Sequence, residues 1–430
     1  MLINGLQNEP HLLNQFVSTI ALNHSDHPNK LDYSNQVFEY VQNPTGFTLN
    51  SLIRAHSKSS SPHLSFYYYN QILQSSNLFI YLDNYTFTFL VRACTQILSR
   101  ECGFAVHAAV IKHGFEFSRY VQCALVQMYA ELGLFSLSRR LFLGIVDPDL
   151  VLQTTMVSAS AKLGKVIFAR KLFDEMPTRD LAAWSAIIAG YAQCGKSKEA
   201  LDLFHLMQRE GVMVNEVVMT SVLSACSHLC ALDQGRWAHG YIERNKIRMT
   251  VTLGSALIDM YAKCGDMGKA MEAFWGMRER NVYTWSCAMS GLAMNGSGKE
   301  CLELFALMKE QDVQPNEVTF VAVLRGCSVV GLVDEGHRHF ESMKQVYGLE
   351  PRLEHYGCMV DLYCRAGRLD DAIEFINNMP VEPHAGAWGA LLSACKIHGN
   401  VELGELAFRK LVELEENNDV CRFHGLGWGK

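Results

Sequence analysis

Cysteine is the residue type with the most chemical potential in this chain of 430 residues, which contains fourteen cysteines. A structural zinc site needs clustered thiolate or imidazole ligands, commonly with a Cys-x-x-Cys spacing. No Cys-x-x-Cys occurs here, and the closest pair is Cys226 and Cys230. We therefore expect neither a metal site nor another cofactor.

The cysteines instead recur at fixed positions of a repeated pattern. One set follows Ala or Gly (Cys94, Cys226, Cys327 and Cys395), and another precedes Gly (Cys194 and Cys264). Free cysteine behaves as a small apolar side chain, and unpaired cysteines are typical of reducing compartments. We predict that these cysteines are small buried packing residues.

Other catalytic patterns are not evident in the sequence. No Ser/His/Asp constellation and no glycine-rich phosphate loop interrupts the repeated pattern. His107 and His239 share one position of that pattern, so we expect them to face packing or solvent rather than to form a ligand set. The sequence therefore predicts that this chain is not an enzyme.

A stretch of 35 residues organises the chain. Leu181–Asn215 returns 101 residues later as Val282–Asn316, with Trp184 matching Trp285. A third copy begins around Trp388, in AWGALLSACKIHGN. Self-similarity at a fixed period is the signature of a repeat architecture.

Each copy predicts two helices. The first has apolar residues at i, i+3, i+4 and i+7, namely Trp184, Ile187, Ile188 and Tyr191. Gly195 follows, where a positive φ can end a helix. The second helix has its own stripe, formed by Ala200, Leu203, Phe204 and Met207. One hairpin cannot bury both stripes alone, so the copies must stack into an all-α solenoid of antiparallel helix pairs.

Composition agrees with a folded, water-exposed chain. The sequence is 49% hydrophobic and 19% charged, which is ordinary for globular proteins. No run approaches about 18 consecutive apolar residues, so we expect no membrane span. The net charge of −6 argues mildly against a broad polyanion binder, but not against a groove lined by neutral or basic residues.

The pattern divides the chain into repeats of about 35, 35 and 31 residues. We expect about eleven repeats, at residues 10–45, 46–83, 84–118, 119–149, 150–180, 181–215, 216–250, 251–281, 282–316, 317–353 and 354–384. A segment of residues 1–9 precedes them, a further helical pair spans 385–416, and residues 417–430 form a divergent tail that we expect to be frayed.

The spacing Y-x-x-x-G…A-x-x-x-F-x-x-M in AIIAGYAQCGKSKEALDLFHLM and ALIDMYAKCGDMGKAMEAFWGM resembles the pentatricopeptide repeat. The alternation of repeat lengths resembles the plant PLS subclass, in which 35- and 31-residue forms alternate. The segment EHYGCMVDLYCRAGRLDDA, followed by WGALLSACKIHGNVELGE, resembles the end of such an array and its first C-terminal extension motif. The resemblance covers about residues 10–416.

This resemblance implies a right-handed superhelical solenoid whose first helices line a groove for single-stranded RNA, with one base per repeat. In the family, the fifth and last residues of each repeat select the base, and the second residue packs on the base faces. The corresponding pairs here are Asn14/Thr45, Asn50/Asp83, Thr88/Ser118, Cys123/Asp149, Thr154/Asp180, Ser185/Asn215, Thr220/Thr250, Ser255/Asn281, Ser286/Asn316, Val321/Leu353 and Cys358/His384. The second residues expected to stack on bases are Phe47, Tyr85, Tyr120, Val151, Val217, Tyr283 and Val318.

The family's pairing tendencies predict the order Y-U-N-K-G-A-N-A-A for the first nine repeats, where Y is a pyrimidine, K is G or U and N is any base. Carboxylates only accept hydrogen bonds, so a last-position Asp suits the imino N–H of uracil or guanine, whereas Asn suits adenine or cytosine. Val321 and Leu353 cannot form side-chain hydrogen bonds at all.

Simpler interpretations remain open at each position. Asn, Asp and Ser at a repeat junction are also typical helix N-caps. Lys162, Lys263 and Arg365 fall near the ends of first helices, where they could meet phosphate or simply face solvent.

The resemblance also bears on C-to-U editing of RNA. Long members of the subclass end in a zinc cytidine deaminase, which combines His-x-Glu with a later Pro-Cys-x-x-Cys. This combination does not occur here, and the second extension motif is missing, because VCRFHGLGWGK follows VELEENND. We expect a protein that recognises RNA sites for C-to-U editing, with a deaminase recruited in trans.

Two alternatives are an RNA processing or stability factor without editing and a helical scaffold that binds a protein or peptide. The resemblance implies a mitochondrion or chloroplast, with the mitochondrion slightly favoured. Residues 1–9 contain no Arg and one Glu, so no transit peptide is visible and the chain is expected to be an incomplete gene product.

Overall fold

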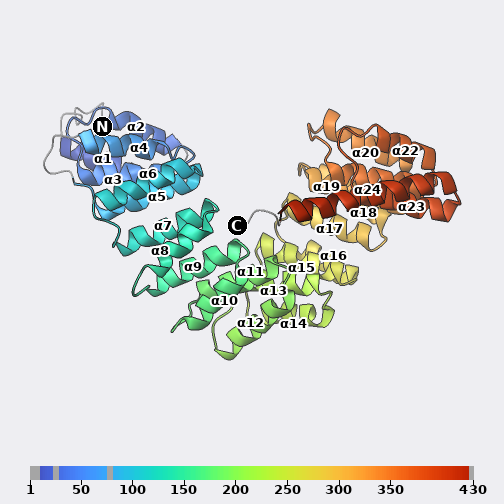
Figure 1. The fold of residues 1–430 in the computed structure, drawn as a ribbon, viewed down its shortest axis with the longest axis horizontal. Coiled ribbons are helices and arrows are strands. Elements are labelled where there is room, and N and C mark those ends of the chain that lie inside the picture. Colours follow the sequence, from blue (N-terminus) through green and yellow to red (C-terminus); the bar gives the residue numbers. More distant parts are fainter. Residues whose placement is uncertain (1–9, 23–28, 75–80, 426–430) are drawn as a thin grey trace. The chain divides into compact units, whose positions relative to one another are not determined.

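The computed structural model describes residues 10–22, 29–74 and 81–425, with side chains up to residue 414. Regular structure in these ranges consists of 24 α-helices and no strands (Figure 1). The predicted all-α fold is confirmed. The expected N-terminal segment 1–9 and the last five residues of the expected tail lie outside the described residues. In the part that is described, no helix is long and apolar enough to cross a membrane.

The chain consists of two units, Met1–Cys194 and Gly195–Lys430. The first unit contains α1 Pro10–Leu22, α2 Asn29–Phe38, α3 Gly46–His56, α4 Leu64–Gln74, α5 Asn84–Ile97, α6 Arg100–Lys112, α7 Arg119–Glu131, α8 Phe135–Leu143, α9 Leu150–Lys162, α10 Val166–Glu175 and α11 Leu181–Gln193. The second contains α12 Ser197–Arg209, α13 Glu216–His228, α14 Leu232–Arg244, α15 Val251–Lys263, α16 Met267–Gly276, α17 Val282–Met294, α18 Gly298–Glu310, α19 Glu317–Val330, α20 Val333–Gln345, α21 Leu353–Arg365, α22 Leu369–Asn377, α23 Ala385–His398 and α24 Val401–Gly425.

Within each unit the odd-numbered helices, here called first helices, form one continuous row. In the first unit α1, α3, α5, α7, α9 and α11 pack in sequence, and in the second unit α13 to α23 do the same. Each of these helices, apart from α11 at the end of its unit, also packs against the even-numbered second helix that follows it (Figure 1). The predicted solenoid of antiparallel helix pairs is therefore confirmed for both units.

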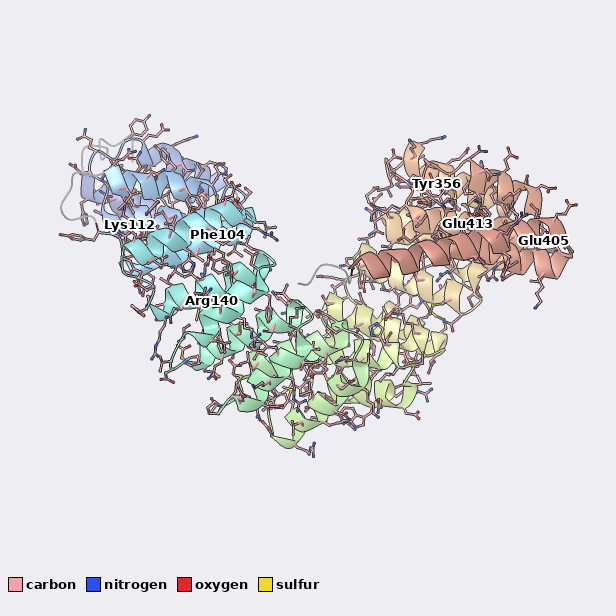
Figure 2. The ribbon with its side chains drawn as sticks, viewed as in Figure 1. Phe104, Lys112, Arg140, Tyr356, Glu405 and Glu413 are labelled. Carbon is pink, nitrogen blue, oxygen red and sulfur yellow. The ribbon has the colours of Figure 1, made fainter. Side chains whose placement is uncertain are left out.

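The two repeat lengths arise from the second helices. Second helices of the shorter repeats, α8, α10, α16 and α22, have only 9 or 10 residues. Among the longer repeats, α6, α12, α14, α18 and α20 all have 13, whereas α2 and α4 of the first two repeats have 10 and 11. From α6 onward the shorter period therefore removes about one helical turn, because a turn contains about 3.6 residues. In Figure 2, Phe104 and Lys112 lie on the long helix α6, and Arg140 lies on the short helix α8.

Two glycine contacts set the spacing of first helices. Gly190 on α11 packs so closely on α9 that an added Cβ would lie 2.5 Å from the Cβ of Ala161. At the equivalent position 101 residues on, a Cβ on Gly291 would lie 2.6 Å from the Cβ of Ala262. Any side chain would force the helices apart, so glycine permits the close approach.

A buried tryptophan joins consecutive repeats. The Trp184 indole is fully buried and meets the Phe173 ring edge-on, with centroids 4.6 Å apart. Arg179 covers the Phe173 ring and donates from Nε to the Phe173 carbonyl oxygen at 3.0 Å. The second unit repeats this arrangement with Trp285, Phe274 and Arg280. Aromatic contact and burial therefore tie α10 to α11 and α16 to α17.

The cysteines are free thiols among the described residues, and most of the predicted burial is confirmed. Cys94, Cys226, Cys327 and Cys395 are all buried, at the ends of first helices. Cys264 is half-buried, and Cys194 is exposed, so the prediction of burial was wrong for Cys194. It is the C-cap of α11, at the end of the helix.

The last helix is longer than the sequence pattern indicated. We expected regular structure to fade after residue 416, whereas α24 continues to Gly425. No proline or glycine stands between residues 405 and 424, so nothing in the local sequence stops the helix.

Trp184→Ala is expected to lower the free energy of unfolding by about 3–5 kcal/mol, because it opens a large cavity between two repeats. Urea unfolding followed by circular dichroism measures the loss. Trp275→Ala is the control, because that indole is half exposed and should cost less. Equal losses for the two variants would contradict the role assigned to Trp184.

Thiol labelling should separate the cysteines. Burial raises the pKa of Cys94, Cys226 and Cys327 to about 12, so these thiols stay protonated at about pH 8. Iodoacetamide followed by peptide mass spectrometry should label exposed Cys194 and Cys230 first, and the buried thiols only after denaturation. Rapid labelling of Cys226 in the folded protein would contradict this prediction.

Candidate nucleic-acid interface

The last residue of most expected repeats is the N-cap of the next first helix. A new helix leaves its first N–H groups without partners, and a short polar side chain can accept from one of them. In eight cases the side chain accepts from the N–H three residues on, at 2.7–3.2 Å. These residues are Thr45, Asp83, Asp149, Asp180, Asn215, Thr250, Asn281 and Asn316.

Three last positions differ. Ser118 and His384 are N-caps without a side-chain capping bond. Leu353 lies inside α21, whose N-cap is Arg352. The apolar Leu353 cannot cap, so the helix boundary falls one residue earlier than in the other repeats.

Capping determines which polar atom is left for another partner. Asp180 uses Oδ1 to cap Ala183, and its Oδ2 accepts no hydrogen bond from the described residues. Asn215 likewise caps Val218 through Oδ1, which leaves the Nδ2 amide hydrogens without a partner in the described chain. A capping Asp therefore presents an acceptor, and a capping Asn presents a donor.

The fifth residues lie one turn into the first helices, and several are more buried than expected. The hydroxyls of Thr88, Ser185, Thr220, Ser255 and Ser286 donate to the carbonyl oxygen four residues earlier at 2.7–2.8 Å. Asn14, Thr88, Ser255 and Ser286 are buried. Cys123, Val321 and Cys358 are half-buried.

Some pairs are in direct contact. Asn50 donates from Nδ2 to Oδ2 of Asp83 at 3.0 Å. Thr154 donates to Oδ1 of Asp180 at 3.2 Å. Burial, and then the nearby Asp149 carboxylate, raises the pKa of Cys123 to about 11, so that thiol remains neutral.

Asn14, like Asn50, has both of its side-chain polar atoms engaged by other residues. Its Nδ2 donates to the Asn43 carbonyl oxygen at 3.0 Å. Its Oδ1 accepts from the Thr45 N–H at 2.9 Å and from Thr48 Oγ1 at 2.7 Å. In this arrangement Asn14 orders the junction around Thr45.

The second residues form an exposed apolar series beside the caps. Phe47, Tyr85, Tyr120, Val151, Val217, Tyr283 and Val318 all have large exposed side chains, with 49–67% of their surface accessible. The rings of Tyr85 and Tyr120, on neighbouring first helices, face each other with centroids 6.1 Å apart and an interplanar angle of 27°. Exposed flat and apolar groups of this kind can pack on the face of any base.

A cavity of about 330 Å³ brings these elements together on α7, α9 and α11. Its lining includes Val151, Thr154 and Asp180, which are the second, fifth and last residues of one expected repeat. Lys162 and Glu131 also line it and form an ion pair at 3.2 Å. The cavity thus has an apolar wall, a hydroxyl and a carboxylate acceptor.

The basic residues near the ends of first helices are ion-paired. Besides Lys162, Lys263 binds Asp259 at 3.0 Å and Arg365 binds Asp361 at 2.9 Å. Exposed pairs of this kind contribute little and can rearrange. The three side chains can still turn to a phosphate, but their present partners are carboxylates.

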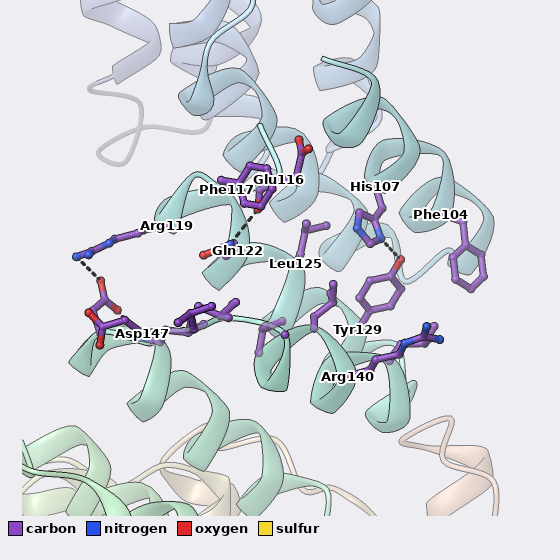
Figure 3. A pocket seen from close by; sticks show the side chains of 18 residues that line it. Phe104, His107, Glu116, Phe117, Arg119, Gln122, Leu125, Tyr129, Arg140 and Asp147 are labelled. Atoms are coloured by element: carbon purple, nitrogen blue, oxygen red, sulfur yellow. Dashed lines mark hydrogen bonds and ion pairs between the residues drawn. The ribbon is translucent and has the colours of Figure 1, made fainter. Parts of the chain in front are cut away.

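A larger cavity, of about 780 Å³, opens between α6, α7 and α8 (Figure 3). Its walls are mainly apolar, and His107 contacts the Tyr129 hydroxyl through Nδ1 at 2.7 Å. Burial lowers the pKa of His107, which keeps the imidazole neutral. His239 makes the same contact with Tyr261 at 3.0 Å. Each of these histidines therefore pairs with a tyrosine of the next repeat. In the described chain, no group of three or more His, Cys, Asp or Glu residues is placed to hold a metal ion.

Four threonines were not among the residues predicted from the sequence. Thr48, Thr86, Thr284 and Thr319 are the third residues of first helices, and each contacts both the cap and the preceding fifth residue. A threonine three residues after a Thr, Asp or Asn cap was the available signal, because it resembles a capping box.

Rows of paired helices with capped, polar junctions define a tandem helical-hairpin repeat protein. Residues 179–228 and 280–329 match the model described as PPR repeat family, and residues 154–181, 255–282, 318–346 and 347–380 match models described as PPR repeat. A pentatricopeptide repeat-containing protein of Arabidopsis thaliana is 60% identical over 416 residues, covering 97% of this chain and 67% of that protein. The chain belongs to the pentatricopeptide repeat family.

Further relatives and a solved structure agree with this assignment. One A. thaliana member named as chloroplastic is 46% identical, with 90% of this chain and 70% of that protein covered. Another, named as mitochondrial, is 39% identical, with 78% of this chain and 54% of that protein covered. The crystal structure of PPR10 in complex with an 18-nt psaJ RNA element has the same fold, with a TM-score of 0.50, 15% identity and coverage of 92% of this chain and 64% of that chain. The chain spans about two thirds of the length of the first three curated relatives.

Asp180→Asn should change base preference without loss of stability. Asn caps a helix as well as Asp does, but it replaces the outward acceptor with a donor. We expect the preferred base at this repeat to shift from guanine toward adenine, measured as dissociation constants for four RNAs that differ at one base.

Asp266→Asn is the matched control, because Asp266 caps the second helix α16 and lies away from the first-helix junctions. It should leave base preference unchanged. If Asp180→Asn and Asp266→Asn gave the same preferences as the native chain, Asp180 would not contact the base.

Proposed function

We propose that this chain binds single-stranded RNA in a sequence-specific manner along the first helices of both units. The observation that carries the proposal is the combination, repeat after repeat, of a capping side chain with one polar atom left over and an exposed apolar second residue. The first group can distinguish bases by hydrogen bonding, and the second can stack on them without regard to sequence. The solved RNA complex of PPR10, which shares this fold, supports the choice of ligand.

The capping chemistry supports a particular order of bases. Asp83 and Asp180 leave acceptors for the imino N–H of uracil or guanine, and Asn215, Asn281 and Asn316 leave donors for the ring nitrogen of adenine or cytosine. Uracil at Asp83 requires the Asn50 hydrogen bond to open, because Asn50 already occupies Oδ2. The preferred RNA is Y-U-N-K-G-A-N-A-A from 5′ to 3′.

We further propose that the biological role is recognition of an organellar RNA site for C-to-U editing, with a deaminase acting in trans. The support is the mixture of 35- and 31-residue repeat lengths in the sequence, which resembles the PLS subclass, and the matching difference in second-helix length between α6 with 13 residues and α8 and α10 with 9 and 10. Relatives named as chloroplastic and mitochondrial support an organellar location. The division of residues 10–384 into eleven repeats and the interpretation of residues 385–416 as an extension motif are also parts of this proposal.

Binding can be tested directly with the recombinant chain. A synthetic RNA centred on CUCUGACAA should bind at least about tenfold more tightly than a scrambled RNA of equal composition, as expected when several hydrogen bonds of about 1 kcal/mol each are lost together. Fluorescence anisotropy measures both constants. Equal affinities would contradict sequence-specific binding, and no binding to either RNA would contradict the RNA function.

The role in plant cells requires a second experiment. Crosslinking and sequencing of RNA bound to the tagged protein, beside a transcriptome of a knockout, should identify one organellar site with that order. A cytidine just downstream that is unedited in the knockout would support editing. Enrichment with unchanged editing would support RNA processing or stability instead, and a co-purifying protein without RNA would support a scaffold.

A further inference from the structure

Two carboxylates lie beside proposed base sites without being caps. The cavity on α7, α9 and α11 is lined by Val151, Thr154 and Asp180, the second, fifth and last residues of one expected repeat. It is also lined by Gln127 and Glu131, the ninth and thirteenth residues of the first helix that precedes this repeat. The later turns of one first helix therefore share a cavity with the proposed base-selecting residues of the next repeat.

Asp259 has the equivalent place in the second unit. It is the ninth residue of α15, as Gln127 is of α7. The neighbouring Cys287 thiol first, then burial, and also the Asp259 carboxylate raise the pKa of Tyr283 to about 12. Tyr283 is the expected stacking residue of the repeat that follows α15, so Asp259 stands beside the base site of that repeat.

Each carboxylate has one oxygen engaged and one left over. Asp259 Oδ2 accepts from Ser227 Oγ at 2.7 Å and from Lys263 Nζ at 3.0 Å. Glu131 Oε1 accepts from Lys162 Nζ at 3.2 Å. Asp259 Oδ1 and Glu131 Oε2 accept no hydrogen bond from the described residues. Because carboxylate oxygens only accept, each site can take one further hydrogen-bond donor.

A serine holds Asp259 in place independently of the lysine. Ser227 is 2% exposed, and the single hydrogen of its hydroxyl goes to the Asp259 carboxylate. The same arrangement recurs further along the second unit, where Ser328 donates to Asp361 Oδ2 at 2.6 Å and Arg365 donates to the same oxygen at 2.9 Å. The carboxylate therefore keeps its orientation when the basic residue turns to a phosphate.

The position of these carboxylates suits the ribose of a bound nucleotide. The ninth and thirteenth residues lie about 6 Å and about 12 Å further along a first helix than the fifth residue, at about 1.5 Å per residue. The pairing edge of a base lies opposite the bond to its ribose. A base held by the fifth and last residues therefore directs its sugar toward these later turns, where the 2′-hydroxyl of RNA is the available donor.

A carboxylate beside a nucleic-acid backbone is unfavourable unless it gains such a donor. Phosphates repel it, and a strand that covers it removes water from the free oxygen. The ribose 2′-hydroxyl replaces the lost water with a hydrogen bond, whereas the deoxyribose of DNA offers only C–H groups there. The carboxylate therefore distinguishes the two kinds of sugar.

We infer that Glu131 and Asp259 each accept a hydrogen bond from a ribose 2′-hydroxyl, at the fifth and ninth nucleotides, and thereby select RNA over DNA. This inference rests on the proposed RNA binding and deepens it, because the fifth and last residues still read the base while the carboxylates identify the sugar. In the order CUCUGACAA these nucleotides are the G opposite residues 150–180 and the final A opposite residues 282–316.

Two neighbouring sites lack such a carboxylate and serve as natural controls. The ninth and thirteenth residues are Ala189 and Gln193 in α11, and Ser224 and His228 in α13. The repeats that follow these helices, at residues 216–250 and 251–281, face the seventh and eighth nucleotides. Removal of the 2′-hydroxyl from these two nucleotides should have little effect on binding.

Single-atom changes in a synthetic RNA test the inference. Fluorescence anisotropy would measure dissociation constants for RNAs centred on CUCUGACAA that carry one 2′-deoxy nucleotide each. Binding should weaken about tenfold for the change at nucleotide five or nine, as for one hydrogen bond to a charged group, and less than about twofold at seven or eight. A 2′-fluoro nucleotide, which keeps the RNA-like sugar pucker but cannot donate, should weaken binding as much as 2′-deoxy.

Two variants assign each effect to its carboxylate. Asp259→Ala should abolish the 2′-deoxy effect at nucleotide nine and retain it at nucleotide five, and Glu131→Ala should do the reverse. Each variant is therefore the matched control of the other. Asp259→Ala also leaves the buried Ser227 hydroxyl without its acceptor. If thermal unfolding showed that this variant does not fold, Glu131→Ala, at an exposed residue, would still decide the question.

Other outcomes overturn the inference. Equal losses at nucleotides five, seven, eight and nine would indicate a general effect of the sugar on the RNA strand. Full affinity with 2′-fluoro would show that no hydrogen is donated, and a 2′-deoxy effect that persists in both variants would assign it to another group. Failure of the native chain to prefer CUCUGACAA over a scrambled RNA would overturn the proposed function itself. That result is distinct from a sequence preference that does not depend on the 2′-hydroxyls.

Discussion

The need to cap each first helix is the constraint on which the rest of this structure depends. Every new helix exposes N–H groups that the helix cannot satisfy, and at most junctions the last residue of the previous repeat accepts from one of them. Eight side chains, from Thr45 to Asn316, do this with nearly the same geometry. Since the capping oxygen is fixed, the second polar atom of an Asp or Asn must point elsewhere. A requirement of helix formation thereby places a series of acceptors and donors along the row of first helices in each unit.

Close packing of the first helices holds these groups in register. Gly190 and Gly291 allow neighbouring helices to approach until a single Cβ would clash. Trp184 and Trp285 then join each of these helices to the preceding second helix through an edge-on contact with Phe173 or Phe274. The spacing of the polar groups therefore depends on buried apolar contacts that never meet a ligand. This division suits a modular binding surface, because exposed residues can vary while the packing residues remain.

The structure also explains why the capping and binding interpretations of the junction residues are compatible. A cap occupies one oxygen, and base selection needs one remaining atom, so a single Asp or Asn can serve both purposes. The two interpretations differ only where the side chain has no second polar atom. Thr45 and Thr250 cap through their hydroxyl oxygen and have less left to offer.

Much of the fold was determined by the sequence itself. The apolar stripes, the 101-residue echo and the turn glycines predicted helix pairs that must stack, because local periodicity and stacking follow from neighbouring residues. The position of the junction residues at the end of each repeat also follows from the sequence, since an N-cap stands immediately before its helix.

Only the tertiary structure decided which polar groups are accessible. Ser255 and Ser286 occupy the same position as Thr220, yet they are closed off while Thr220 is half-buried. Ser255 and Ser286 each lie within 3 Å of a buried threonine of the next first helix, Thr284 or Thr319, whereas Leu253 is the residue at that position beside Thr220. The continuation of α24 to Gly425 and the exposure of Cys194 were likewise not predicted. Burial depends on contacts between residues about 30 positions apart, such as the 2.8 Å contact of Ser286 with Thr319, and the pattern within one repeat does not contain them.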